Sequence, residues 1–151
     1  MTPYEVTATE VPESTPYKYQ GLPLTPNELD LADCTVVEGT GSGSVYVYYF
    51  PSYRLLAEFR CDERWPVKVG MAALGNAKIR ITDQQGTAMP ERPVVAYVRR
   101  SNTPLKLERL VHAVLFCRGR QLDDAPGNEW FSSSPEEVKS IIDWAHAGER
   151  P

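Results

Sequence analysis

The sequence has few cysteines and histidines, and it has no long apolar segment. Its three cysteines, Cys34, Cys61 and Cys117, lie far apart and form no CxxC pair. They therefore predict a reduced, cytoplasmic protein without a disulfide framework, with Cys117 as a small core residue of an apolar helix. Two histidines, His112 and His146, argue against a histidine-based metal centre. No run of 18 apolar residues and no signal peptide is present, so no membrane association is predicted.

Several catalytic signatures are also missing. There is no nucleophile elbow, no HExxH motif and no Cys/His pair at the spacing of metal ligands. The glycine-rich stretch 39–43 lacks the Gly-Lys-Ser/Thr ending of a phosphate loop and precedes a predicted strand instead of a helix. It is better explained as a flexible connector.

Length and composition predict one ordered domain with an irregular extension. The chain has 151 residues, of which 42% are hydrophobic, and it contains 13 prolines and 10 glycines. Residues 1–43 form the predicted N-terminal arm, with a short helix that a capping-box pattern starts at Thr25. Residues 44–147 form the predicted domain.

Charge is unevenly distributed along the chain. The net charge is −4, but residues 64–120 carry eleven Lys and Arg against three Asp and Glu, whereas residues 1–43 carry one Lys against seven acids. A basic middle section favours a surface that faces phosphate groups, although a solvated face without a partner has the same composition. The candidate nucleic-acid contacts are Lys78, Arg99, Arg100, Arg118 and Arg120.

Two short segments read as strands that could pair. Residues 44–50 alternate β-branched and aromatic residues, and residues 67–70 end in a glycine. A period of two places Val45, Val47 and Tyr49 on one face of the first strand, and Tyr46, Tyr48 and Phe50 on the other. A hairpin of the two strands brings a tyrosine phenol near a lysine amine, which is an acid/base pair.

These two segments resemble the signature of the GIY-YIG nuclease superfamily. Ser44-Val45-Tyr46 stands for Gly-Ile-Tyr, and Lys68-Val69-Gly70 stands for Tyr-Ile-Gly. The second motif is most similar to a phage and bacterial subgroup that carries Lys-Ile-Gly. The segment between the two motifs, residues 51–66, is longer than is usual in the superfamily. The resemblance implies an α+β fold with a small three-stranded antiparallel sheet flanked by helices, whose third strand is 93–100.

The rest of the chain supplies the remaining elements in the order of that superfamily. An amphipathic helix is predicted over 74–85, and its Arg80 resembles the superfamily's catalytic arginine. Thr103-Pro104 starts a second helix, on which Leu107-Glu108 resembles the step that carries the metal-binding glutamate. Glu108 lies at the border of the apolar stripe of this helix, where a carboxylate needs a cation or is displaced outward.

Residues after this helix complete the pattern. Asn128-Glu129-Trp130-Phe131 resembles a Glu-Trp-Phe element of the subgroup, and its two aromatic residues are predicted to close the core. A capping box at Ser134 starts the last helix.

The resemblance implies a metal-dependent DNA endonuclease with Tyr46, Lys68, Arg80 and Glu108 as catalytic residues. Glu108 would hold Mg²⁺ or Mn²⁺, because hard cations prefer oxygen ligands and keep several waters. Arg80 would neutralise phosphate charge. Either Tyr46 or Lys68 would take the proton of the attacking water.

Other interpretations stay open on the sequence alone. His112, Asn128 and Glu129 are secondary candidates, and Glu129 is an alternative metal ligand. The same fold without catalysis would be a nucleic-acid-binding module, and a third alternative is a protein-interaction domain that uses the acidic arm. RNA is an alternative substrate to DNA. Specificity would come from the arm, from dimerisation or from a partner protein.

Overall fold

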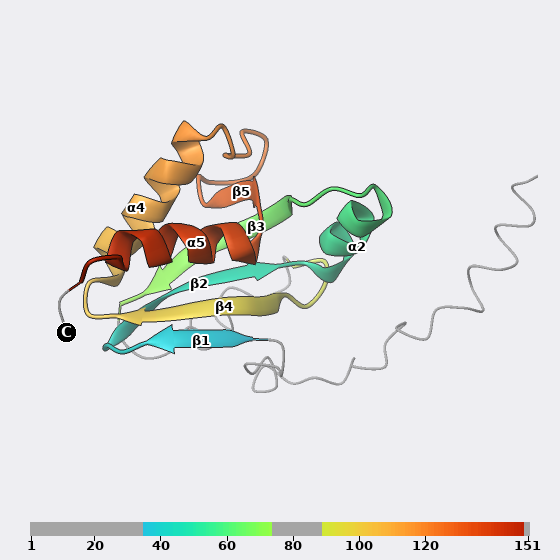
Figure 1. The fold of residues 1–151 in the computed structure, drawn as a ribbon. Coiled ribbons are helices and arrows are strands. Elements are labelled where there is room, and N and C mark those ends of the chain that lie inside the picture. Colours follow the sequence, from blue (N-terminus) through green and yellow to red (C-terminus); the bar gives the residue numbers. More distant parts are fainter. Residues whose placement is uncertain (1–34, 74–88, 150–151) are drawn as a thin grey trace, which may run out of the picture.

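The structure, a computed structural model, describes residues 35–73 and 89–149 of the chain. These residues form a five-stranded sheet flanked by helices (Figure 1). In chain order the elements are β1 (Val36–Gly39), β2 (Gly43–Tyr49), α2 (Pro51–Phe59), β3 (Trp65–Ala72), β4 (Val94–Ser101), α4 (Pro104–Cys117), β5 (Trp130–Ser133) and α5 (Pro135–His146). The predicted α+β class is confirmed.

The sheet is larger than predicted and of mixed direction. Its strand order is β1-β4-β2-β3-β5. The three predicted strands are its centre, where β2 pairs antiparallel with both β3 and β4. Two short strands extend it: β1, which falls within the predicted irregular arm, pairs parallel with β4, and β5 pairs antiparallel with β3.

Strand β1 is held by a polar cluster as well as by its ladder. The Tyr97 hydroxyl of β4 donates a 2.8 Å hydrogen bond to Glu38 of β1, and Lys139 of α5 lies 3.2 Å from the same carboxylate. Hydrogen bonds from Tyr97 and Lys139 lower the pKa of Glu38, while burial and this hydrogen bond raise the pKa of Tyr97. The side chains thus join β1, β4 and α5.

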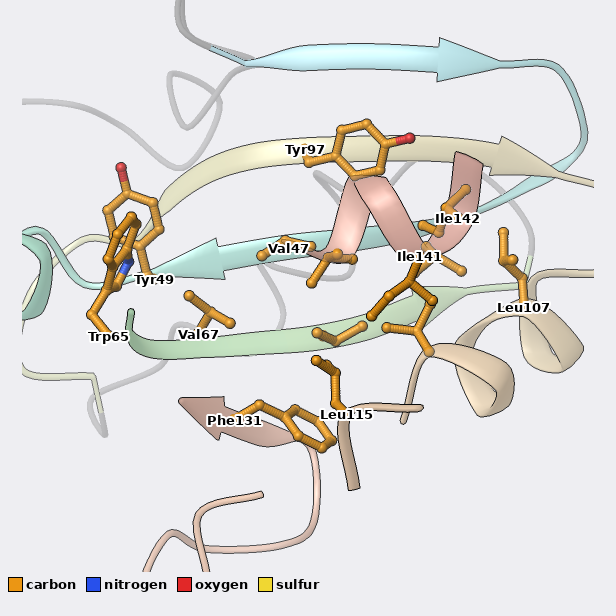
Figure 2. Packing of buried hydrophobic residues seen from close by; sticks show 14 of the residues in the cluster. Val47, Tyr49, Trp65, Val67, Tyr97, Leu107, Leu115, Phe131, Ile141 and Ile142 are labelled. Carbon is orange, nitrogen blue, oxygen red and sulfur yellow. The ribbon is translucent and has the colours of Figure 1, made fainter. Parts of the chain in front are cut away.

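The two faces of β2 are used differently, as its alternation predicted. Val45, Val47 and Tyr49 belong to the main core beneath α4 and α5, and Figure 2 shows Phe131, Leu115 and Ile142 packing into that core. Tyr46 and Tyr48 belong to a second, smaller cluster on the opposite face, with Val95 and Val98. Phe131 closes the main core as predicted, whereas Trp130 is only partly buried and packs against the second cluster.

The helix starts follow the predicted caps. Thr103 is the N-cap of α4, followed by Pro104, and the Ser134 side chain accepts a 3.1 Å hydrogen bond from the Glu137 amide at the start of α5. Cys117, predicted to be a core residue, is exposed because it follows the buried Leu115 by two residues and therefore lies on the opposite side of the helix.

Helix α2 occupies the long connection between the two motifs. It has one buried residue, Ala57, and it leaves Leu55 and Phe59 exposed. Arg54 anchors it, because its guanidinium donates a 2.9 Å hydrogen bond to the Tyr49 hydroxyl and lies 5.5 Å from the ring centroid of Trp65.

Two predicted helices, 74–85 and the short one from Thr25, lie outside the described residues, and so do Lys78 and Arg80. Among the helices described, none is long and apolar enough to cross a membrane.

Glu137 of α5 ties the end of α4 to β5 and α5. Its carboxylate accepts a 2.6 Å hydrogen bond from Ser133 and a 2.9 Å bond from Arg118, and Arg120 lies 3.3 Å away. Burial raises the pKa of Glu137, but the hydrogen bonds from Ser133 and Arg118 and the charge of Arg120 outweigh it, so that the pKa lies below its ordinary value of 4.5.

We predict that Glu137→Gln lowers the free energy of unfolding by about 2 kcal/mol at pH 7, because charge-assisted hydrogen bonds are lost from a mostly buried group. Since the folded-state pKa is lowered, the difference from wild type should be complete above pH 4.5 and shrink as the pH falls through the folded-state value. Urea unfolding across this pH range measures it. Glu136→Gln, an exposed neighbour in the same helical turn, is the control; an equal loss in both variants would contradict the prediction.

Candidate functional site

The two signature motifs interlock through one close contact. Tyr46 of β2 and Gly70 of β3 are directly opposite each other, and the phenol of Tyr46 lies across Gly70. A Cβ atom at position 70 would come within 2.5 Å of the Tyr46 hydroxyl oxygen and 2.6 Å of its ring carbon Cζ. Glycine is therefore required here for close approach of a side chain to the backbone of β3.

Lys68 lies on the same face as Tyr46, one pleat along β3 from Gly70. It is directly opposite Tyr48 in the ladder, and its ammonium is 5.7 Å from the centroid of the Tyr48 ring. The ammonium also lies 3.3 Å from the carboxylate of Glu129, which immediately precedes β5. Its side chain is only 13% exposed, so this cation is held within the structure rather than in solvent.

Aromatic rings lie next to this lysine on the same face of the sheet. The rings of Tyr46 and Tyr48 are nearly parallel, with centroids 6.0 Å apart, and Trp130 meets Tyr48 edge-on at 5.8 Å. Tyr46 and Tyr48 are 1% and 2% exposed. Burial and packing against Tyr48 thus restrict the plane of the Tyr46 ring, and with it the direction of the phenol.

Glu108 and His112 reach the same stretch of β3 from helix α4. The ring Nε2 of His112 is 2.8 Å from the carbonyl oxygen of Val69, the residue before Gly70. Strand β5 pairs with β3 only as far as Lys68, so His112 occupies the outer edge where β3 continues beyond β5. His112, a secondary candidate for the site, therefore forms a hydrogen bond at the edge of the sheet.

Glu108 lies one helical turn before His112 and consequently faces the same edge. It is 7% exposed, which confirms its predicted place at the border of the core. Helix α4 covers the face of the sheet opposite to Tyr46, so Glu108 and Tyr46 belong to elements on different sides of the sheet.

The described residues offer few metal ligands. No group of three or more His, Cys, Asp and Glu side chains that could hold a metal ion occurs among residues 35–73 and 89–149. Such a donor set does not suit Zn²⁺, which needs three or four protein ligands. It suits Mg²⁺, which one or two carboxylates bind together with substrate phosphates and waters.

The basic residues predicted to contact nucleic acid are scattered over several surfaces. Arg118 and Arg120 pair with Glu137 between α4 and α5. Arg99 is opposite Val45, on the face that the helices cover. Arg100 is opposite Ser44 and exposed, and it is the one described arginine of this set that shares the face of Tyr46.

Ser44 is a residue whose part in the site was not predicted. It occupies the glycine position of the first motif, and it is 2% exposed on the same face as Tyr46. Its hydroxyl oxygen has no hydrogen-bond partner within the structure that 35–73 and 89–149 form. The replacement of glycine by serine was the signal in the sequence. Asn128, a secondary candidate, is exposed in the loop before β5, where its carbonyl accepts a bond from Gln121.

A cavity of about 140 Å³ lies elsewhere, between α2, α5 and the helix-covered face of the sheet. Trp65, Tyr97, Arg54 and Lys139 are among its lining residues, and none of the candidate catalytic residues borders it. Both cations already have carboxylate partners, Glu58 for Arg54, and Glu38 and Asp143 for Lys139. We therefore take Tyr46 and Gly70, rather than this cavity, as the candidate functional site.

Comparison with known protein families agrees with the extent of this fold. The family model of the T5orf172 domain matches residues 43–146, from the start of β2 to the end of α5. The chain therefore belongs to the T5orf172 domain family. Comparisons with curated proteins and with solved structures give no match.

The contact between Tyr46 and Gly70 generates a prediction about stability. We predict that Gly70→Ala lowers the free energy of unfolding by about 1–3 kcal/mol, because the new methyl group overlaps a buried phenol. In a Tyr46→Leu background, which removes the overlapping atoms, the same substitution should cost clearly less. Urea unfolding of the four proteins of this double-mutant cycle measures the coupling. An equal cost in both backgrounds would show that the two residues do not constrain each other.

Proposed function

We propose that this domain is a GIY-YIG-type endonuclease that hydrolyses phosphodiester bonds in DNA. The observation that carries the proposal is the placement of the Tyr46 phenol on Gly70, with Lys68 on the same face. The T5orf172 domain, whose model matches the chain, is often associated with nucleases and with DNA binding. Membership of that family and the interlocked motifs support the same chemistry independently.

Tyr46 is the residue that we assign to accept the proton of the attacking water. Lys68 lies 3.3 Å from the Glu129 carboxylate in an ion pair, and an ammonium group has no lone pair with which to accept a proton. A cation near a phenol stabilises the charge that the phenolate would carry. Lys68 therefore supports deprotonation of Tyr46 in this proposal, and Glu129 positions Lys68 rather than binding the metal.

Glu108 is the residue that we assign to hold Mg²⁺ or Mn²⁺. Its carboxylate is mostly buried beside the outer edge of β3, and the scarcity of further acidic ligands suits a cation that keeps waters and takes substrate oxygens. When bound there, the ion would stabilise negative charge on the phosphate oxygens. His112 positions α4, and therefore Glu108, through its hydrogen bond to the Val69 carbonyl.

Arg80 completes the proposed set as the cation for the scissile phosphate, a role that the resemblance to the superfamily implies. It lies outside the described residues, so the proposal for Arg80 depends on the motif order alone.

Nicking of supercoiled plasmid DNA with Mg²⁺ or Mn²⁺ tests the proposed function. Wild-type protein should convert supercoiled to open-circular DNA, and EDTA should stop the reaction. We predict that Tyr46→Phe and Glu108→Gln each slow nicking by about 10²-fold or more, because each removes a group that acts on the transition state.

Glu63→Gln is the matched control for the charge change, since Glu63 is an exposed carboxylate in the turn before β3. Melting temperatures of all variants separate loss of activity from loss of folding. Activity that survives both Tyr46→Phe and Glu108→Gln would refute the site. DNA binding without nicking by wild type would instead favour the non-catalytic binding module, and absence of both would favour a protein-interaction domain.

A further inference from the structure

Ser44 carries a buried polar group that the fold does not use. Ser44 is 2% exposed, and its hydroxyl has no hydrogen-bond partner in the described part of the protein. A buried hydroxyl that loses its bonds to water without gaining others destabilises the folded state. Such groups are rare in native proteins and require an explanation other than stability.

The neighbours of Ser44 point to the ligand that this hydroxyl meets. Ser44 precedes Tyr46 by two residues on β2, so both side chains lie on one face. Arg100 of β4 is directly opposite Ser44 in the antiparallel ladder, where Cβ atoms are about 4.5–5.5 Å apart. Arg100 is exposed, and it forms no ion pair with another described residue. The side chains of Ser44 and Arg100 thus leave the sheet from adjacent positions, on the face that carries the candidate catalytic phenol.

We propose that Ser44 and Arg100 bind a phosphate group of the nucleic acid adjacent to the scissile phosphate. In this proposal the Ser44 hydroxyl would donate one hydrogen bond to a phosphate oxygen, and the guanidinium of Arg100 would donate a charge-assisted bond to another. This inference rests on the proposed function, because it assigns the phosphate to the substrate of the Tyr46 site. Ser44 and Arg100 are then substrate-binding residues that fix the register of the nucleic-acid strand in the site.

Burial of Ser44 is compatible with this role because it matches that of Tyr46. The two residues are 2% and 1% exposed and are neighbours on the same strand face. The proposed function requires that a phosphodiester reach the Tyr46 phenol, and Ser44 is the next side chain along the same face of β2. Of the described basic residues predicted to contact nucleic acid, Arg99, Arg118 and Arg120 do not lie on this face.

The substrate role and a structural role for Ser44 predict opposite effects on stability. If the hydroxyl served the fold, Ser44→Ala would lower the melting temperature. If the hydroxyl instead serves to bind a ligand, Ser44→Ala removes an unpaired buried group, and the melting temperature should stay unchanged or rise by about 2–4 °C. Thermal unfolding of the full chain without DNA gives this first readout.

DNA affinity gives the second readout, independent of catalysis. A fluorescent 20-base-pair duplex is titrated with the full chain in EDTA at several salt concentrations, and binding is followed by anisotropy. Arg100→Ala should weaken binding about tenfold and reduce the slope of log K against log salt by about one. Ser44→Ala should weaken binding about threefold to tenfold with little change of slope, and Ser44→Thr, which keeps the hydroxyl, should retain affinity.

Arg64→Ala is the matched control, because Arg64 is exposed at the opposite end of β3. The inference is overturned if wild type binds the duplex and Ser44→Ala and Arg100→Ala bind as tightly, or if Ser44→Ala lowers the melting temperature. It is also overturned if Arg64→Ala and Arg100→Ala weaken binding equally. If wild type binds no DNA, the proposed function fails together with this inference. If wild type binds DNA and the variants bind it equally well, only this inference fails.

Discussion

The close approach of Tyr46 to Gly70 is the constraint on which the candidate site depends. An aromatic ring can lie across a neighbouring strand only where that strand has no side chain, and the register of β2 and β3 places glycine at that point. A slip of one residue would put Val69 opposite Tyr46 and turn Lys68 to the helix-covered face. The ladder that determines the fold therefore also determines which groups surround the phenol.

The sheet separates stability from the candidate chemistry. Apolar residues of β2 and β3 face α4 and α5 and form the main core, whereas the opposite face carries Tyr46, Lys68 and Ser44. A partly buried ammonium and an unpaired hydroxyl both oppose folding unless other contacts offset them. Their presence together on one face is the pattern expected where local stability has been exchanged for function.

Local rules predicted much of this architecture, and the failures have physical causes. The alternation of β2 and the caps at Thr103 and Ser134 are short-range signals that tertiary structure left unchanged. Strands β1 and β5 have four residues each, too few for alternation to show, and they become strands because the edges of the central sheet offer unpaired backbone groups. Charge summed along the chain could not separate Arg99 from Arg100, although consecutive residues of a strand point to opposite faces. Nor could it foresee that Arg118 and Arg120 are taken by Glu137, a residue distant in the sequence.

The candidate site is assembled around an edge of the sheet, and this makes helix α4 a part of its geometry. The hairpin alone positions Tyr46 and Lys68, but the carboxylate of Glu108 comes from a helix that packs on the other face of β3. The contact of His112 with the Val69 carbonyl fixes that helix beside the residue that precedes Gly70. Leu107, Val111 and Leu115 of the same helix are buried in the main core, so core packing and this hydrogen bond together determine where the helix lies. The precision of the site then depends on His112 as much as on the residues that would touch the substrate.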